Sequence, residues 1–259
     1  MLILLPPSEG KSAPRKGAPL DLGGLALTTL NPAREAVLDA LVDLCANRPG
    51  DAMDLLGIPK TQPELIDLNA SLREAPTARA DRIYTGVVYD ALDPATLSTA
   101  AKRRAAARVM VTSSVFGLVG LADRIPAYRL SGDTTLPGLG PVQSHWRQHL
   151  AGALRDHAGH GLVIDLRSQV YAAFWAPEES AAARTATVRV LHEVGGRRKV
   201  VSHFNKATKG RIVRALLEDG ANPRTPVALA EVLGDLGWPV ELGASGKKGT
   251  QLDIVVKEL

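Results

Sequence analysis

GLVIDLRSQVYAAFW, residues 161–175, contains a short apolar run, then an arginine and a serine, and then a second, mixed apolar segment. A short apolar run that ends in polar residues is typical of a strand buried inside a sheet. The segment from residue 168 onward has the composition of a short helix. A buried strand followed directly by a helix is a building unit of proteins that mix the two, so this stretch predicts the α/β class.

The same kind of buried strand is predicted at residues 2–5, and the Pro-, Gly- and Ser-rich residues 6–24 that follow it are predicted to be loop. The segment 107–115 is also rich in strand-forming residues. Further strands are predicted at about 185–192, 198–204, 238–242 and 251–256, and helices at about 31–45, 51–56, 61–72, 94–104, 142–156, 206–219 and 226–236. No repeat or linker divides the chain, so we expect one compact domain of mixed α/β (α+β) class over residues 1–259.

Composition excludes several classes of protein. The chain has 259 residues, of which 45% are hydrophobic and 22% charged, as in ordinary globular proteins. Its apolar runs are too short to span a bilayer, and its start lacks the charged region of a signal peptide, so we expect a cytoplasmic protein without a membrane partner. The single cysteine, Cys45, excludes an internal disulfide and is expected in the core. A net charge of +4 permits a phosphate-bearing partner without requiring one.

The loop after the first strand reads PPSEGKS, residues 6–12. It is not a P-loop, because Leu5 stands where that motif needs a glycine. Ser8, Glu9 and Lys11 nevertheless follow the carboxyl end of a predicted strand, where α/β proteins place their sites. The alternative is a solvated loop without function.

Two lysines stand out in the segment SHFNKATKGRIVRALLEDG, residues 202–220. At helical spacing, Lys206 and Lys209 extend the apolar stripe of the helix at its first turn, while Arg211 and Arg214 lie on the other side. Two positive charges at the positive end of a helix predict a bound anion between them. The alternative is that both lysines extend out to solvent past the helix end.

The predicted helices at 206–219 and 226–236, joined by a short turn, predict a helix-hairpin-helix element. Arg211, Arg214 and Arg224 are then available to contact the phosphates of a nucleic acid without regard to its sequence. The alternative is an ordinary pair of antiparallel helices, since the turn lacks the Gly-x-Gly of the best-known DNA-binding hairpins.

The histidines do not predict a metal site. His145 and His149 are four residues apart on a predicted helix, but Trp146 stands where a zincin has its glutamate, and no third ligand has diagnostic spacing. We therefore expect no metal and no cofactor. Tyrosine and arginine interrupt three other apolar stretches, and together they suggest a polar, basic cleft; examples are Tyr128, Arg129 and Arg167.

These blocks, in this order, resemble the YaaA family of peroxide stress proteins over nearly the whole chain. The matching stretches are MLILLPPSEGK (1–11), YTGVVYDAL (84–92), SSVFGLVGLADRIPAYRL (113–130), VIDLRSQVYAAFW (163–175) and VVSHFNKATKGRIVRALLEDG (200–220). Three stretches depart from the family pattern. A Ser-Pro-Ala-Lys start is here Pro-Pro-Ser-Glu-Gly-Lys, a Lys-Lys-x-Arg-Gly stretch is here Lys-Ala-Thr-Lys-Gly-Arg, and the polar residues after the VIDL strand also differ.

The resemblance implies a compact α/β domain with a basic cleft and a helix-hairpin-helix element. It also implies a role in oxidative stress, in which the protein binds DNA and limits damage to it by iron. Matched position by position, the residues that line or flank the cleft are Lys11, Arg129, Lys206, Lys209 and Arg211, with Arg214 beside them.

An enzyme is the rival hypothesis, and the resemblance brings no established reaction with it. The same cleft could bind a phosphate-bearing small molecule, a nucleotide or a nucleobase. Lys206 or Lys11 would then act as nucleophile or general base, with the pKa of its amine lowered by neighbouring positive charge. Ser8 and Tyr171 would orient the substrate or transfer protons.

Overall fold

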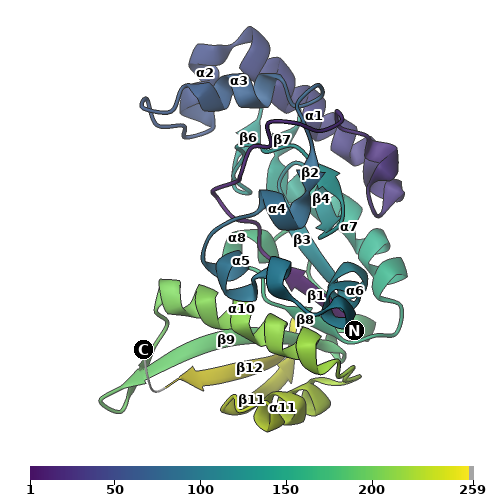
Figure 1. Cartoon of the computed structure of the whole chain (residues 1–259), viewed down its shortest axis with the longest axis vertical. Helices are drawn as coiled ribbons and strands as arrows, with labels where there is room; N and C mark the ends of the chain where they lie inside the picture. The colour runs from purple at the N-terminus through teal and green to yellow at the C-terminus, as the bar shows by residue number, and fades with distance from the viewer. Residues whose placement is uncertain (257–259) are drawn as a thin grey trace.

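The computed structural model describes residues 1–256, apart from the side chains of Val194, Ser202 and His203. The main sheet has the strand order β11-β12-β9-β8-β1-β3-β4, with β10 paired to β9 (Figure 1). Its strands are β1 (Leu2–Leu5), β3 (Val109–Ser113), β4 (Gly117–Gly120), β8 (Val163–Asp165), β9 (Thr185–Val194), β10 (Arg197–Lys199), β11 (Val240–Gly246) and β12 (Gly249–Val256). Two small sheets pair β2 (Ala78–Arg79) with β5 (Arg124–Ile125), and β6 (Thr135–Leu136) with β7 (Gly140–Pro141).

The first strand, β1, lies at the centre of this sheet. It pairs in parallel with β3 on one side, where Ile3 faces Val109, and with β8 on the other, where Leu2 faces Val163. All four residues of β1 are buried, as expected for a strand covered on both faces. The strands β8, β9 and β12 continue the parallel pairing, while β4 and β11 are antiparallel. The predicted α/β class is confirmed.

The helices gather in groups around the sheet. They are α1 (Asn31–Asn47), α2 (Pro49–Leu55), α3 (Glu64–Ala70), α4 (Ala80–Ile83), α5 (Val87–Leu92), α6 (Thr99–Arg108), α7 (Val142–Ala158), α8 (Gln169–Ala172), α9 (Glu179–Ala182), α10 (Ser202–Asp219) and α11 (Pro226–Asp235), with 3-10 turns η1 (Leu22–Gly24), η2 (Thr28–Leu30) and η3 (Pro94–Thr96). Figure 1 shows α1, α2 and α3 at one end of the long axis and the hairpins of β9 to β12 at the other. No described helix is both long enough and apolar enough to cross a membrane.

Several predicted elements differ from the structure. The strand predicted at 198–204 is wrong in its second half, because β10 ends at Lys199 and α10 begins at Ser202. Gly195 and Gly196, both with positive φ, close a tight β9–β10 turn that leaves little length for the second strand. The helix predicted at 94–104 starts only after Ser98, whose hydroxyl accepts a bond from the Ala101 amide. The short helices α4 and α5 were not predicted.

Helix α10 packs closely on α5, and it passes in front of β9 in Figure 1. The contact requires a glycine at position 210. A Cβ atom there would lie 2.2 Å from the Val88 carbonyl oxygen and 2.8 Å from the Ala91 Cβ. The backbones of the two helices therefore touch directly.

The turn between α10 and α11 is tied to α6. Arg104 donates to the carbonyl oxygens of Leu217 (2.6 Å) and Glu218 (3.1 Å), and Arg108 donates to that of Ala221 (3.0 Å). These bonds satisfy carbonyls at the end of α10. While α10 packs on α5 and α6, α11 packs on β11 and β12, so the two helices have different main partners.

The α5–α10 contact predicts that Gly210→Ala lowers the free energy of unfolding by about 1–3 kcal/mol, because the new methyl group has no space. The matched control is Gly152→Ala in α7, where a Cβ would meet nothing within 4 Å. We expect that change to be neutral or to stabilise by about 0.5–1 kcal/mol. Urea unfolding measures both, and equal effects of the two changes would contradict the close contact.

Candidate functional site

The carboxyl ends of β1 and β8 are the place where ligands are expected in this topology. The chain runs from β1 to β3 on one side of β1 and later returns to β8 on the other side. The loops that leave such neighbouring strands diverge and open a crevice. Residues 6–12 and 166–168 leave the sheet at this point.

Lys11 belongs to the loop that follows β1, and its side chain folds back over that loop. Its Nζ donates to the carbonyl oxygens of Ser8 (2.9 Å) and Glu9 (3.4 Å), and it lies 4.1 Å from the centre of the Tyr128 ring. The Lys11 backbone forms a β-bridge with Tyr84. The side chain is therefore fixed by its own loop and by two aromatic neighbours.

The four tyrosines of the chain lie close to one another, and two of them, Tyr84 and Tyr128, lie beside this lysine. The hydroxyls of Tyr84 and Tyr128 are 3.0 Å apart, the rings of Tyr84 and Tyr89 stack at 5.4 Å, and Tyr89 donates to the Pro6 carbonyl at 2.7 Å. Tyr171 is close enough to raise the pKa of the other three. The sequence has these tyrosines in separate blocks, which together predicted a polar, basic cleft, but it gave no sign that the tyrosine rings and hydroxyls contact one another.

Serines and a threonine complete the polar part of the cluster. Ser113 at the end of β3 lies 2.8 Å from the Tyr128 hydroxyl and accepts the Phe116 amide at 3.0 Å. Ser8 accepts the backbone amide of Thr85 at 3.1 Å, so the loop after β1 is bonded to the segment that joins α4 and α5. Ser8 therefore has a structural role in the folded protein.

The charge state of the cluster follows from its burial. Desolvation and, to a smaller extent, the charge of Arg129 lower the pKa of Lys11 to about 7, against the opposing effect of Glu9. Burial raises the pKa of Tyr171 to about 12. At neutral pH the lysine is therefore partly an uncharged amine, whereas the tyrosine hydroxyl keeps its proton.

Arg129 is presented toward this cluster by a rigid backbone. The side chain of Asn69 accepts its amide at 2.8 Å and donates to its carbonyl at 2.7 Å. Within the described residues, the half-buried guanidinium forms no hydrogen bond or ion pair, although its charge acts on Lys11. The structure thus brings Lys11 and Arg129 together and leaves the arginine available for a ligand.

The two lysines of α10 lie in different environments. Lys209 is buried, and its Nζ donates to the Leu166 carbonyl at 3.0 Å. Burial lowers the pKa of Lys209, and the nearby Asp165 opposes this. Lys206 is exposed. The alternative that both lysines extend into solvent is wrong for Lys209, which already has a partner in the interior, and the paired anion site stays a prediction.

Arg214 is also engaged inside the fold. It donates to the carbonyl oxygens of Leu92 and Asp93, each at 3.0 Å, at the end of α5. The expectation that Arg211 and Arg214 form one exposed side is therefore wrong for Arg214, whereas Arg211 is exposed. Asp165 is the last residue of β8, and it forms an ion pair with the buried Arg167 at 2.7 Å. Arg167 therefore has a structural role as well.

An open groove of about 590 Å³ lies between α4, η3 and α6. The charged residues that line it are one carboxylate, Asp81, and four basic side chains: Arg79, Arg82, Lys102 and Arg103. Asp81 pairs with Arg79 at 2.6 Å, which leaves three cations without a carboxylate partner among the described residues. These residues were not predicted as site residues, although the run Lys-Arg-Arg at 102–104 is a visible signal in the sequence.

Helix α10 holds one wall of this groove in place. Glu218 accepts bonds from the Ser98 amide (2.9 Å) and the Ser98 hydroxyl (2.6 Å), next to the η3 residues that line the groove. Arg214 binds the chain just before η3. Both side chains therefore position the groove without entering it.

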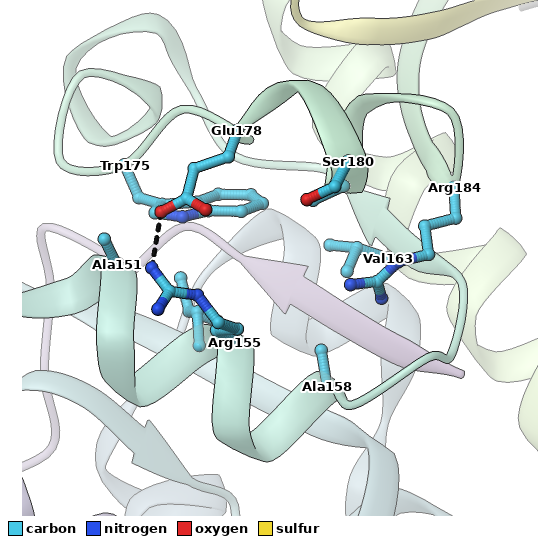
Figure 2. A pocket seen from close by; sticks show the side chains of 10 residues that line it. Ala151, Arg155, Ala158, Val163, Trp175, Glu178, Ser180 and Arg184 are labelled. Atoms are coloured by element: carbon cyan, nitrogen blue, oxygen red, sulfur yellow. Dashed lines mark hydrogen bonds and ion pairs between the residues drawn. The ribbon is translucent and has the colours of Figure 1, made fainter.

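A second, much smaller pocket lies between α7 and α9 (Figure 2). Arg155 and Glu178 pair across it, Trp175 forms one side, and the volume of about 30 Å³ suits one or two water molecules. None of the residues predicted as site residues lines it.

The histidines of α7 form no metal site with a third ligand among the described residues. The rings of His145 and His149 are 4.8 Å apart, and His145 Nε2 lies 3.0 Å from the Ala33 carbonyl oxygen. Burial lowers the pKa of His145. The expected absence of a bound metal or cofactor stays a prediction.

Known proteins resemble this chain over its length. The sequence model of the family described as "Peroxide stress protein YaaA" matches residues 1–238. A UPF0246 protein of Streptomyces coelicolor is 53% identical over 261 residues, covering all of both chains. UPF0246 proteins of Corynebacterium efficiens and Corynebacterium glutamicum (strain R) are 42% and 38% identical, covering 99% and 96% of this chain and 100% and 98% of their own.

Lys11 makes stability depend on pH in a defined direction. Below about pH 7 the amine is charged in both states, and between pH 7 and 10.5 only the unfolded chain carries the proton. Because the unfolded state then binds more protons, wild-type stability gains from Lys11 as pH rises through this range. We therefore expect the free energy of unfolding of Lys11→Met, compared with that of wild type, to be highest at pH 6. The difference between the two free energies should fall as the pH rises toward 10. Urea unfolding across this range would show a constant difference if the amine stays charged.

The contacts of Arg214 predict that Arg214→Ala lowers the free energy of unfolding by about 1–2 kcal/mol, because two carbonyls at the end of α5 lose their partner. The control is Arg211→Ala on the same helix, which should change stability by less than about 0.5 kcal/mol. Thermal melting of both variants makes the comparison. Two equal, small effects would contradict the structural role of Arg214.

Proposed function

The chain belongs to the YaaA family of peroxide stress proteins, and from this premise we propose that it binds DNA when the cell responds to peroxide. One observation carries the proposal: the open groove between α4, η3 and α6 is lined by four basic side chains and one acidic side chain. A groove of that kind can bind the phosphates of a nucleic-acid backbone, and such binding does not depend on the base sequence.

The groove supports this role better than the cations of α10. Arg82, Lys102 and Arg103 are exposed, so little desolvation opposes their contact with phosphate. Lys209 and Arg214, by contrast, already bind carbonyl oxygens of the protein. The helix-hairpin-helix element expected at about 206–236 adds a second contact region in this proposal, through exposed residues such as Lys206, Arg211 and Arg224.

Limitation of iron damage follows from the same electrostatics. Cations condense on DNA because of its phosphate charge, and a basic protein releases them when it binds. Fe²⁺ held on DNA is one such cation. A protein that covers the backbone would displace it, so that radicals formed from peroxide and iron arise away from the DNA. The cytoplasmic location expected from the sequence belongs to this proposal.

The proposal predicts that Lys102→Ala with Arg103→Ala weakens binding to duplex DNA equally for unrelated sequences. Removing two phosphate contacts should lower the slope of log affinity against log salt by up to about 2. Fluorescence anisotropy of a labelled duplex at several salt concentrations measures both quantities.

The matched control is Lys247→Ala with Lys248→Ala, two adjacent exposed cations in the β11–β12 turn. It removes the same charge from a different surface and should leave the slope unchanged. Lys206→Ala with Arg211→Ala tests α10 in the same way. If only the α10 variant lowers affinity and slope, the groove is not the DNA site.

A further inference from the structure

Lys11 combines three features that DNA binding does not use: its amine lies inside a polar cluster, faces another cation, and remains partly accessible at the surface. We propose that Lys11 is a nucleophilic amine that forms a Schiff base with a small carbonyl compound bearing a carboxylate, of the 2-oxo acid class. The proposal is independent of the groove and concerns the cluster around Lys11, in the loop that follows β1.

The hydrogen bonds of the amine leave its lone pair free. Nζ is within reach of two acceptors, the carbonyl oxygens of Ser8 (2.9 Å) and Glu9 (3.4 Å). A neutral amine has two N–H groups, and these two oxygens accept both of them. Since neither oxygen can donate, the lone pair points away from them and is available to attack a carbonyl carbon.

The groups that face Lys11 favour this neutral form. Arg129 repels a proton on Nζ, while Glu9 and the ring of Tyr128 attract one. Tyr84 faces the lysine from α4, and its hydroxyl is un-ionised because burial raises its pKa. Burial and Arg129 prevail and bring the pKa of Lys11 to about 7. At that pH the neutral fraction is on the order of a thousandfold larger than for a lysine of ordinary pKa.

Arg129 supplies the recognition of charge. Its backbone is clamped by Asn69, and its guanidinium has no partner within the described residues. A guanidinium binds a carboxylate through two parallel hydrogen bonds. A 2-oxo acid carries its carboxylate directly on the reacting carbonyl, so a carboxylate bound by Arg129 would hold that carbonyl on the side of Lys11, whose pKa the charge of Arg129 lowers.

The reaction balances without an oxidant or reductant. The Nζ lone pair forms a bond to the carbonyl carbon, and the carbonyl π pair moves to oxygen. A proton from nitrogen neutralises that oxygen to give a carbinolamine. The hydroxyl then leaves with a second proton as water, and the C=N bond forms. Tyr171, whose hydroxyl is protonated at neutral pH, is a candidate to relay these protons from α8.

Other lysines of the described residues lack one of the required features. Lys209 has a lowered pKa but is buried, and its Nζ binds the Leu166 carbonyl near Asp165. Lys206, Lys247 and Lys248 are exposed to water. The structure thus favours Lys11 over Lys206 as the nucleophile expected from the sequence, and Lys206 serves as an internal control for unselective labelling.

The experiment traps the Schiff base in the full-length protein. Glyoxylate is added at pH 7 with cyanoborohydride, and peptide mass spectrometry locates the reduced adduct. Acetaldehyde, which lacks the carboxylate, is the paired probe. We expect one adduct per chain on Lys11, formed at least tenfold faster with glyoxylate, with a rate that rises with pH to a midpoint near 7. Labelling spread over exposed lysines, or equal rates with both probes at Lys11, would overturn the proposal.

Two variants separate reactivity from recognition. Lys11→Arg keeps the positive charge and should abolish the adduct. Arg129→Gln should reduce the ratio of the glyoxylate rate to the acetaldehyde rate at Lys11 about tenfold, a readout that a purely structural role would not move. Thermal melting checks that each variant is folded, and if Lys11→Arg is not, the rate ratio of Arg129→Gln decides alone. The groove variant Lys102→Ala with Arg103→Ala should label like wild type, which keeps this test separate from DNA binding.

Discussion

The position of β1 between β3 and β8 is the constraint on which the rest of the structure depends. Four apolar residues, buried and paired in parallel on both sides, fix the three strands at the centre of the sheet. Their carboxyl ends therefore meet at one edge, and Pro6 and Pro7 turn the chain out of the sheet there. The loop with Lys11, the serine that ends β3 and the Asp165–Arg167 pair are neighbours for that reason.

Four basic residues of this protein serve the fold by binding backbone oxygens. Arg34 is fully buried and donates to the carbonyls of Phe116 (3.0 Å) and Leu118 (2.8 Å), while burial lowers its pKa to about 10. Lys209, Arg167 and Arg214 likewise bind backbone oxygens. A charged donor can satisfy carbonyls that secondary structure leaves unpaired, at the cost of desolvation. Net charge therefore does not indicate which basic side chains are available to a ligand. Their burial and their hydrogen-bond partners do.

Sequence patterns predicted the central strands and the long helices because those elements carry their own periodicity. The run at 2–5 and the helix at 142–156 correspond closely to β1 and α7. Sequence patterns did not predict the elements and sites that depend on contacts between residues far apart in the sequence. Helix α5 packs on α10 at Gly210, and Glu218, far along the chain, binds Ser98 beside the groove. Neither contact has a local sequence pattern. The contacts among the four tyrosines had no sequence signal of their own, because the tyrosines come from three separate blocks that predicted only a polar, basic cleft.

The central strand also sets the order in which this protein can fold. During synthesis, β1 emerges first, yet Ile3 must wait for Val109 and Leu2 for Val163, more than one hundred residues later. Closing loops of that length is slow, because chain entropy is lost before any pairing compensates for it. Until then an apolar strand stays unpaired on the ribosome, open to aggregation. The pairing of β1 with β8 can therefore be completed only after Val163 has been synthesised.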